Sequence, residues 1–318
     1  MGGFALTLGV LLVGIFFNTY LFGLVTYQFA SYWRTKFNDP WPIRMMVNFL
    51  FVLDCSHSAF VIYMAWDYCV ANYNNPAVLQ LALWPLTFTP IATAIASFIT
   101  QTFLGWRVYR LTHSYALYGF ILLISLLACI FGMICGVRAM IIALSAKLVV
   151  LQHLVTAWLV FQVFADVFIA ATLGLFLWRS KTGFEKTDSV VNRLIRGAIQ
   201  TGIFAAAFSL GDLISFLTAP DANFYGMFAI PIGRIYTNTL LDTLLARSEL
   251  RNKLNGAIDL DSTRQAPSRL RWAAATAASA TVQQGSNIQL AEIEVQKDVV
   301  VFGDDGSPQD VKSSMHAV

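Results

Sequence analysis

The sequence predicts an all-α membrane protein: a bundle of seven transmembrane helices with its amino terminus outside and its carboxyl terminus in the cytosol. Three observations carry this prediction. The 318-residue chain is 57% hydrophobic and only 12% charged, against roughly 25% charged in soluble domains. Several apolar runs reach the length of about twenty residues that a helix needs to cross a hydrocarbon layer of about 30 Å. Lysine and arginine alternate between the gaps that separate these runs.

Seven apolar runs are long enough to be spans. They cover residues 4–31, 43–70, 78–106, 115–137, 149–178, 197–218 and 224–245. Prolines in the gaps, at Pro40, Pro76 and Pro220, mark places where a helix does not continue. Residues 1–253 are therefore expected to form one transmembrane domain. Residues 254–318 are rich in small and polar side chains, and we expect them to form a disordered cytoplasmic tail.

The distribution of basic residues predicts the orientation, because lysine and arginine collect in cytoplasmic loops. Thirteen of them lie in the gaps after the first, third and fifth runs, at the start of the second run (Arg44) and directly after the seventh, whereas the opposite side holds only Arg138 and Lys147. This asymmetry places the amino terminus outside, and topology alone suggests the plasma membrane. Cys69 and Cys135 both fall near the outer face, and the sequence does not decide whether a disulfide joins them.

Five Asp, His or Arg residues lie deep inside the predicted spans, away from their ends: Asp54, His57, Asp166, Asp212 and Arg234. A charge at the centre of a membrane helix costs about 2.5–3.5 kcal/mol on insertion scales, so such residues face the interior and find partners. At about 1.5 Å per residue, Asp54, Asp166 and Arg234 lie at a similar depth. We expect Arg234 to pair with Asp54 or Asp166, with His57 one turn outward from Asp54. The cluster either locks helices together or forms a midplane site for a ligand, ion or proton.

Enzymatic and cofactor chemistry finds little support in the residues. A catalytic zinc generally takes three protein ligands, and His57 is the only histidine deep in a span. Ser56 and Ser58 adjoin His57 in sequence, which puts their side chains on different faces of the helix. No lysine occurs between Lys186 and Lys253, so the last span offers no Schiff base for retinal. We expect no metal, no cofactor and no enzymatic activity.

The remaining classes are receptors and transporters. Seven helices with an external amino terminus match G-protein-coupled receptors by analogy, but residues 106–109 read Trp-Arg-Val-Tyr and residues 230–232 read Ile-Pro-Ile. A transporter would show internal repeats or broken helices, and Pro90 could open the third span. Gly202 and Gly211 more simply indicate close helix packing. We expect a receptor- or sensor-like protein, with a small-solute transporter as the alternative.

The expected partners follow from this class. They are the lipid bilayer, a small ligand, and a cytosolic protein that contacts the basic loops and the tail. No feature of the sequence indicates nucleic acid.

A resemblance appears in the basic stretch after the fifth run. It consists of Arg179-Ser180-Lys181-Thr182-Gly183-Phe184, then Thr187-Asp188-Ser189 and Asn192-Arg193-Leu194. Other segments fit in the same order: Leu53-Asp54 with His57, Gln101-Thr102-Phe103, Ala165-Asp166, and Tyr236-Thr237-Asn238. Together, over roughly residues 3–253, they resemble a fungal family known as domain of unknown function 6534.

The resemblance implies a seven-helix membrane protein and brings no established activity. Its most distinctive motif marks Arg179, Thr182, Gly183, Thr187 and Asp188 as a candidate site in a cytoplasmic loop. The seventh run departs from the family pattern, because Asp242 and Leu245 stand where a small residue and an asparagine are common.

Overall fold

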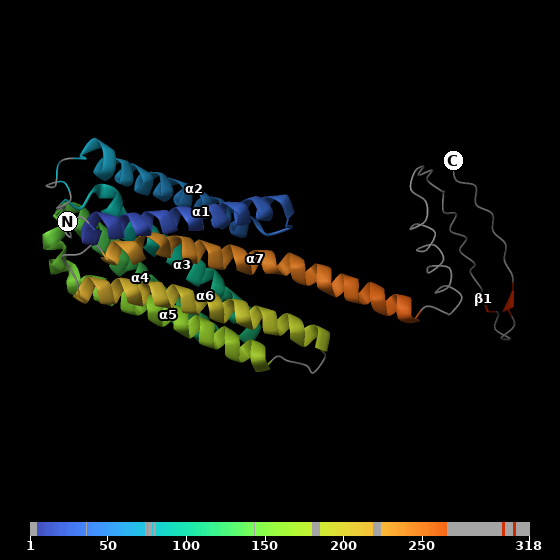
Figure 1. Cartoon of the computed structure of the whole chain (residues 1–318). Helices are drawn as coiled ribbons and strands as arrows, with labels where there is room; N and C mark the ends of the chain where they lie inside the picture. Colours follow the sequence, from blue (N-terminus) through green and yellow to red (C-terminus); the bar gives the residue numbers. More distant parts are fainter. Residues whose placement is uncertain are drawn as a thin grey trace, which may run out of the picture. The chain divides into compact units, whose positions relative to one another are not determined.

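The computed structural model describes residues 5–35, 37–73, 75, 78, 81–142, 144–179, 185–218 and 224–265, with the short pieces 301–302 and 308–309. Contacts divide the chain into two units, Met1–Ala257 and Ile258–Val318. The first unit is built from long helices (Figure 1). In the second, β1 (Val301–Phe302) pairs antiparallel with β2 (Pro308–Gln309).

Each predicted apolar run overlaps one long α-helix. The helices are α1 (Val10–Thr35), α2 (Trp41–Trp66), α3 (Trp84–Thr112), α4 (Tyr115–Ile142), α5 (Gln152–Arg179), α6 (Glu185–Thr218) and α7 (Phe224–Gln265). The π-helical turns η1 (Ala5–Gly9) and η2 (Asp67–Ala71) flank α1 and α2, and the 3-10 helix η4 (Ser145–Leu151) leads into α5. Both α2 and α3 begin with Trp-Pro, and proline fits the first turn because its missing N–H has no partner there.

Several helix boundaries differ from the predicted ones. The third helix begins at Trp84 rather than 78, since Leu81 instead forms an isolated bridge with Leu144. The sixth begins at Glu185 rather than 197, so it includes part of the family motif. The seventh continues to Gln265, past the boundary expected at residue 253. Extending an existing helix adds a hydrogen bond per residue without a new nucleation cost.

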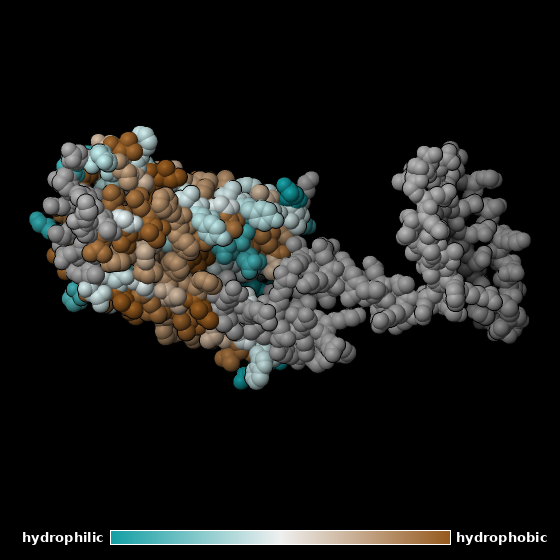
Figure 2. All heavy atoms as spheres, viewed as in Figure 1, coloured by the Kyte–Doolittle hydropathy of each residue, from teal (hydrophilic) through white to brown (hydrophobic). Residues whose placement is uncertain are grey.

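Among the described residues, five helical stretches are long and apolar enough to cross a membrane. They are Leu6–Thr35, Trp41–Ala71, Trp84–Thr112, Tyr115–Ile142 and Lys147–Arg179, and Gly202–Thr218 is a shorter apolar helix. Large apolar side chains such as Phe16, Tyr27 and Ile141 are more than two thirds exposed. Figure 2 shows this apolar flank as a broad brown area, with teal residues nearer the ends. Exposed apolar surface on this scale is suited to lipid, so the first unit of the chain is an all-helical, multi-pass membrane domain.

The middle of α7 lies inside the bundle rather than on its surface. Every residue from 230 to 237 is buried, and a helix buried on all sides occupies a core. Ile232, Leu240 and Leu244 pack there against Val47 and Leu50 of α2. In Figure 1 the orange α7 runs beside α1 and α3. Side chains on α7 are therefore placed to contact several helices at once.

Small residues allow the closest helix contacts. A Cβ added at Gly14 of α1 would lie 2.7 Å from the Met227 Cα of α7, closer than such atoms approach. Gly202 and Gly211 of α6 face Ala170 and the ring of Phe228 in the same way. The close-packing role expected for the two α6 glycines is confirmed, and α7 is held between α1 and α6.

Candidate functional site

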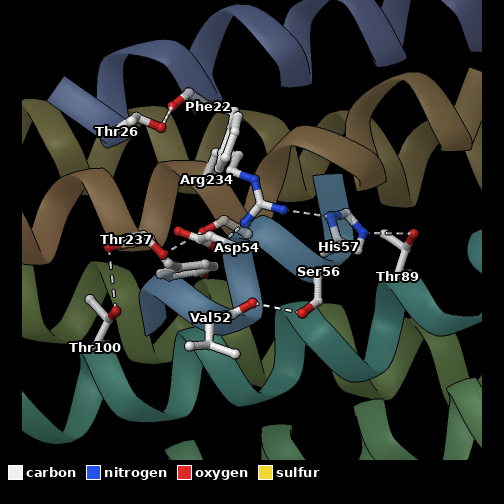
Figure 3. Close-up of polar contacts among 12 residues, drawn as sticks. Phe22, Thr26, Val52, Asp54, Ser56, His57, Thr89, Thr100, Arg234 and Thr237 are labelled. Carbon is white, nitrogen blue, oxygen red and sulfur yellow. Dashed lines mark hydrogen bonds and ion pairs between the residues drawn. The ribbon is translucent and has the colours of Figure 1, made fainter. Parts of the chain in front are cut away.

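Arg234 of α7 is the centre of a buried polar network. Its side chain is 2% exposed and forms an ion pair with Asp54 of α2, which is 1% exposed. The second guanidinium nitrogen lies 2.7 Å from Nδ1 of His57, one turn farther along α2. Figure 3 shows both α2 side chains pointing at Arg234, with the ring of Phe22 on its other side. The guanidinium carbon lies 5.9 Å from the centre of that ring.

The direction of the hydrogen bonds fixes the state of His57. A guanidinium has donors and no acceptor, so Nδ1 of His57 accepts from Arg234. The ring proton is then on Nε2, which donates to the Thr89 hydroxyl oxygen of α3 at 3.1 Å. Thr89 in turn donates to the carbonyl oxygen of Pro85. His57 is therefore neutral, and Arg234 and Asp54 balance each other's charge.

Asp166 of α5 forms a second polar group next to the first. It accepts a hydrogen bond from Gln101 Nε2 of α3 at 2.8 Å and another from the hydroxyl of Tyr236. Tyr236 lies two residues beyond Arg234 on α7, and its carbonyl accepts from Thr100 at 3.3 Å. Asp166 thus joins α3, α5 and α7 without an arginine. It also lines a pocket of about 30 Å³, together with Arg107.

Asp212 of α6 lies apart from both groups. It is 3% exposed and forms no hydrogen bond or ion pair with any side chain that the structure describes. It lines a pocket of about 60 Å³ with Trp158, Tyr225 and Thr89. This pocket is at the end of the bundle where α3, α5 and α7 begin, which we call the amino-terminal end. The five candidates therefore occupy three places: the Arg234 network, the Asp166 group and the Asp212 pocket.

A further ion pair was missed by sequence reasoning. Arg247 near the end of the described α7 side chains binds both carboxylate oxygens of Asp39, at 2.9 and 3.1 Å. Asp39 lies in the loop between α1 and α2 and also accepts from the Tyr32 hydroxyl at 2.9 Å. Arg247 lies over the ring of Phe37. This contact, the Asp39 latch, holds α7 at the end of the bundle opposite the Asp212 pocket. The sequence signal for this latch was weak: an aspartate in a predicted loop, seven residues after Tyr32.

Part of the family motif is outside the described residues. Thr182 and Gly183 are not described, whereas Arg179 is the exposed last residue of α5. Thr187 and Asp188 lie in the first turn of α6. The loop site predicted from the motif therefore remains a prediction.

The cysteines give no support for covalent cross-linking. All four are free, including Cys69 and Cys135, the pair whose bridging the sequence left open. Among the described residues, no cluster of three or more His, Cys, Asp or Glu side chains could hold a metal ion.

Comparison with known proteins places part of the chain in a family context. No curated protein and no solved structure matches the chain. The matched family segment contains Asp166, Asp212, Arg234 and Tyr236, and ends before the second unit of the chain. Asp54 and His57 lie outside it. Over residues 162–249, the chain matches the model of a family described as Family of unknown function (DUF6534), the family its motifs resemble.

Proposed function

We propose that this protein is a receptor- or sensor-like membrane bundle in which the Arg234 network couples a ligand pocket to the far end of α7. One observation carries the proposal. Thr89 both lines the pocket at the amino-terminal end and hydrogen-bonds His57, which binds Arg234 at the centre of the core. A change at the pocket wall therefore reaches α7 through two consecutive hydrogen bonds, between Thr89 and His57 and between His57 and Arg234.

Prolines next to this path support movement of the two helices involved. Pro90 follows Thr89 inside α3, and Pro231 lies between Tyr225 and Arg234 inside α7. A proline within a helix removes one backbone hydrogen bond and clashes with the preceding turn, so it favours a kink. Kinks at these positions allow α3 and α7 to bend where the pocket and the ion pair meet them.

The orientation predicted from the basic residues supports a sensing role. It puts the amino-terminal end, with the larger pocket, on the outside. The opposite end, with the Asp39 latch between α7 and the first loop, then faces the cytosol. A ligand bound outside would act on the latch through α7, and the basic loops would meet a cytosolic partner.

A small-solute transporter is the second candidate, and pockets toward both ends of the bundle favour it. The Asp212 pocket and the smaller Asp166 pocket share no lining residue. Between them lie the buried Arg234 network and the apolar core of α7. Transport would require this layer to open alternately toward each side, whereas a receptor keeps it closed.

Cysteine accessibility distinguishes the two candidates. The four native cysteines are replaced by serine, and a single cysteine is introduced by Ala229→Cys in the outer pocket or Thr243→Cys in the inner one. A membrane-impermeant thiosulfonate is then applied to right-side-out and inside-out vesicles. The control is Val150→Cys, at a site that is 79% exposed.

A receptor-like bundle predicts labelling of each pocket cysteine from one side only, and from opposite sides. Labelling of either pocket cysteine from both sides would favour the transporter. Failure of Val150→Cys to react from the side that reaches Ala229→Cys would contradict the common location of these sites. A thiol labelled from neither side would contradict both candidates, since each requires the pocket to be reached from a membrane face.

A further inference from the structure

We infer that the Asp212 pocket binds a small organic cation, a primary ammonium with a short apolar body. Asp212 is 3% exposed and has no hydrogen-bond or ion-pair partner among the described side chains. A buried ionised carboxylate is unfavourable unless it meets a cation or several donors. A cation bound in the pocket beside Asp212 would supply this partner.

A second unpaired polar atom belongs to a residue of the same pocket. The Tyr225 hydroxyl is buried without a hydrogen-bond partner, and Tyr225 lines the pocket with Asp212. The Nε1 of Trp158 is unpaired too, but it lies against Gly132 of α4, where an added Cβ would be 2.8 Å away. Buried polar groups are almost always paired in native proteins. Two unpaired groups on residues of one cavity therefore indicate a polar occupant, and they come from two helices, α6 and α7.

The lining selects an organic cation over a metal ion. Calcium takes six to eight oxygen ligands, and magnesium keeps most of its waters, whereas the described lining offers one carboxylate. Most of the remaining wall is apolar, with Leu86, Leu148 and Val155, although Thr87 and Thr89 also line it. The rings of Phe216, Trp158 and Tyr225 line the same pocket as the carboxylate, and aromatic faces attract cations. An ammonium bound to Asp212 would leave its alkyl group against the apolar wall.

Pocket size limits the length of the ligand. A volume of about 60 Å³ holds roughly four to six water-sized groups, at about 10–15 Å³ each. Isobutylammonium has one nitrogen and four carbons and fits this range. The pocket lies near the surface of the bundle, since Asp212 is six residues from the end of α6, or roughly 9 Å along the axis.

The inference deepens the proposed function by naming the ligand class, and as a receptor ligand it rests on that function. Binding itself is measurable without any response. Calorimetric titration of isobutylamine is carried out on the full chain in nanodiscs of zwitterionic lipid, with empty nanodiscs subtracted. Isobutanol tests the need for the charge. Tetramethylammonium, which has the same number of heavy atoms and no N–H, tests the need for a hydrogen bond.

Three variants localise the site. Asp212→Asn keeps the shape and removes the charge; it also removes an unpaired buried carboxylate, so we expect it to fold at least as stably as the native chain. Tyr225→Phe removes one unpaired hydroxyl. The matched control is Asp67→Asn, an aspartate of η2 that is outside the pocket lining.

Saturable binding of isobutylamine, weakened about 10- to 100-fold by Asp212→Asn and unchanged by Asp67→Asn, is the expected result. Isobutanol should not bind saturably, and Tyr225→Phe should weaken binding less than Asp212→Asn. Absence of saturable binding, or equal binding to Asp212→Asn, would overturn the inference. Competition by sodium chloride at equal concentration would also overturn it, by identifying an inorganic cation as the occupant. Binding without any change at the far end of α7 would instead count against the proposed function alone.

Discussion

Replacing one partner of the Arg234–Asp54 pair tests how strongly the core depends on it. Both side chains are at most 2% exposed, so solvent screening is small. Removing one partner leaves the other charge buried and unpaired, which costs about 3–5 kcal/mol. Asp54→Leu and Arg234→Met should each destabilise the protein by about this amount. Ordinary hydrogen bonds between membrane helices contribute only about 0.6 kcal/mol each. The loss on mutation therefore distinguishes a mutually dependent buried ion pair from an ordinary polar contact between helices.

The double variant Asp54→Leu with Arg234→Met should recover most of the loss. The native pair is incompletely satisfied, because Asp54 Oδ2 and Arg234 Nε have no hydrogen-bond partner. An apolar pair removes both of these unpaired atoms, and what remains is the Nδ1 of His57, which loses its donor at a cost of about 1–3 kcal/mol. The double variant should therefore be more stable than the sum of the single effects predicts, by at least about 3 kcal/mol.

The assay is reversible unfolding of the purified protein in mixed detergent micelles, followed by circular dichroism. The matched control is Arg34→Met, which removes an exposed arginine at the end of α1 and should change stability by no more than about 0.5 kcal/mol. Single variants that each cost under about 1 kcal/mol, or a double variant equal to the sum of the two, would refute the assignment of a mutually dependent buried pair.

Three further predictions address packing, the latch and orientation. Gly14→Ala should destabilise the protein by about 1–3 kcal/mol, because the new Cβ meets the backbone of α7. The control Gly23→Ala, on the same helix, meets nothing within 4 Å and should be neutral. Equal thermal stability of the two variants would contradict the close contact. Arg247→Ala should lower stability by no more than about 1 kcal/mol, because Arg247 is 42% exposed. The same variant should speed amide exchange around Asp39. Unchanged exchange there would show that the latch does not order the loop. A protease-cleavable tag before Met1 should be cut on intact cells, and protection until the membrane is permeabilised would reverse the orientation.

The sequence predicted the helices well because lipid imposes a simple requirement on chain length and polarity. Each of the seven apolar runs overlaps a helix. Among the described residues, five of these helices are long and apolar enough to cross a membrane. The seventh differs because Arg234 and several polar residues lower its hydropathy, while neighbouring helices bury residues 230–237. A core helix and a lipid-facing helix share the same length, and they differ in which surfaces cover them.

The candidate site was predicted in part. Depth along the helices brought Arg234 level with Asp54 and Asp166, and the structure pairs it with Asp54. Depth cannot choose between two acids at one level, since the rotation of each helix about its axis decides which side chain meets which. For the same reason, depth alone did not show that Asp212 lies apart from the Arg234 network. The Asp39 latch joins residues 208 positions apart, a contact that follows only from the packed fold.

The central claim is that the Arg234 network couples the outer pocket to the far end of α7, beyond its role in holding helices together. Amide hydrogen exchange at residues 238–247, with and without isobutylamine, tests it most directly when the native chain is compared with the apolar double variant Asp54→Leu with Arg234→Met. The account predicts that both bind the amine, that exchange changes in the native chain, and that it does not change in the double variant. The same change in both proteins would contradict the account, because the ion pair would then only hold α2 and α7 together.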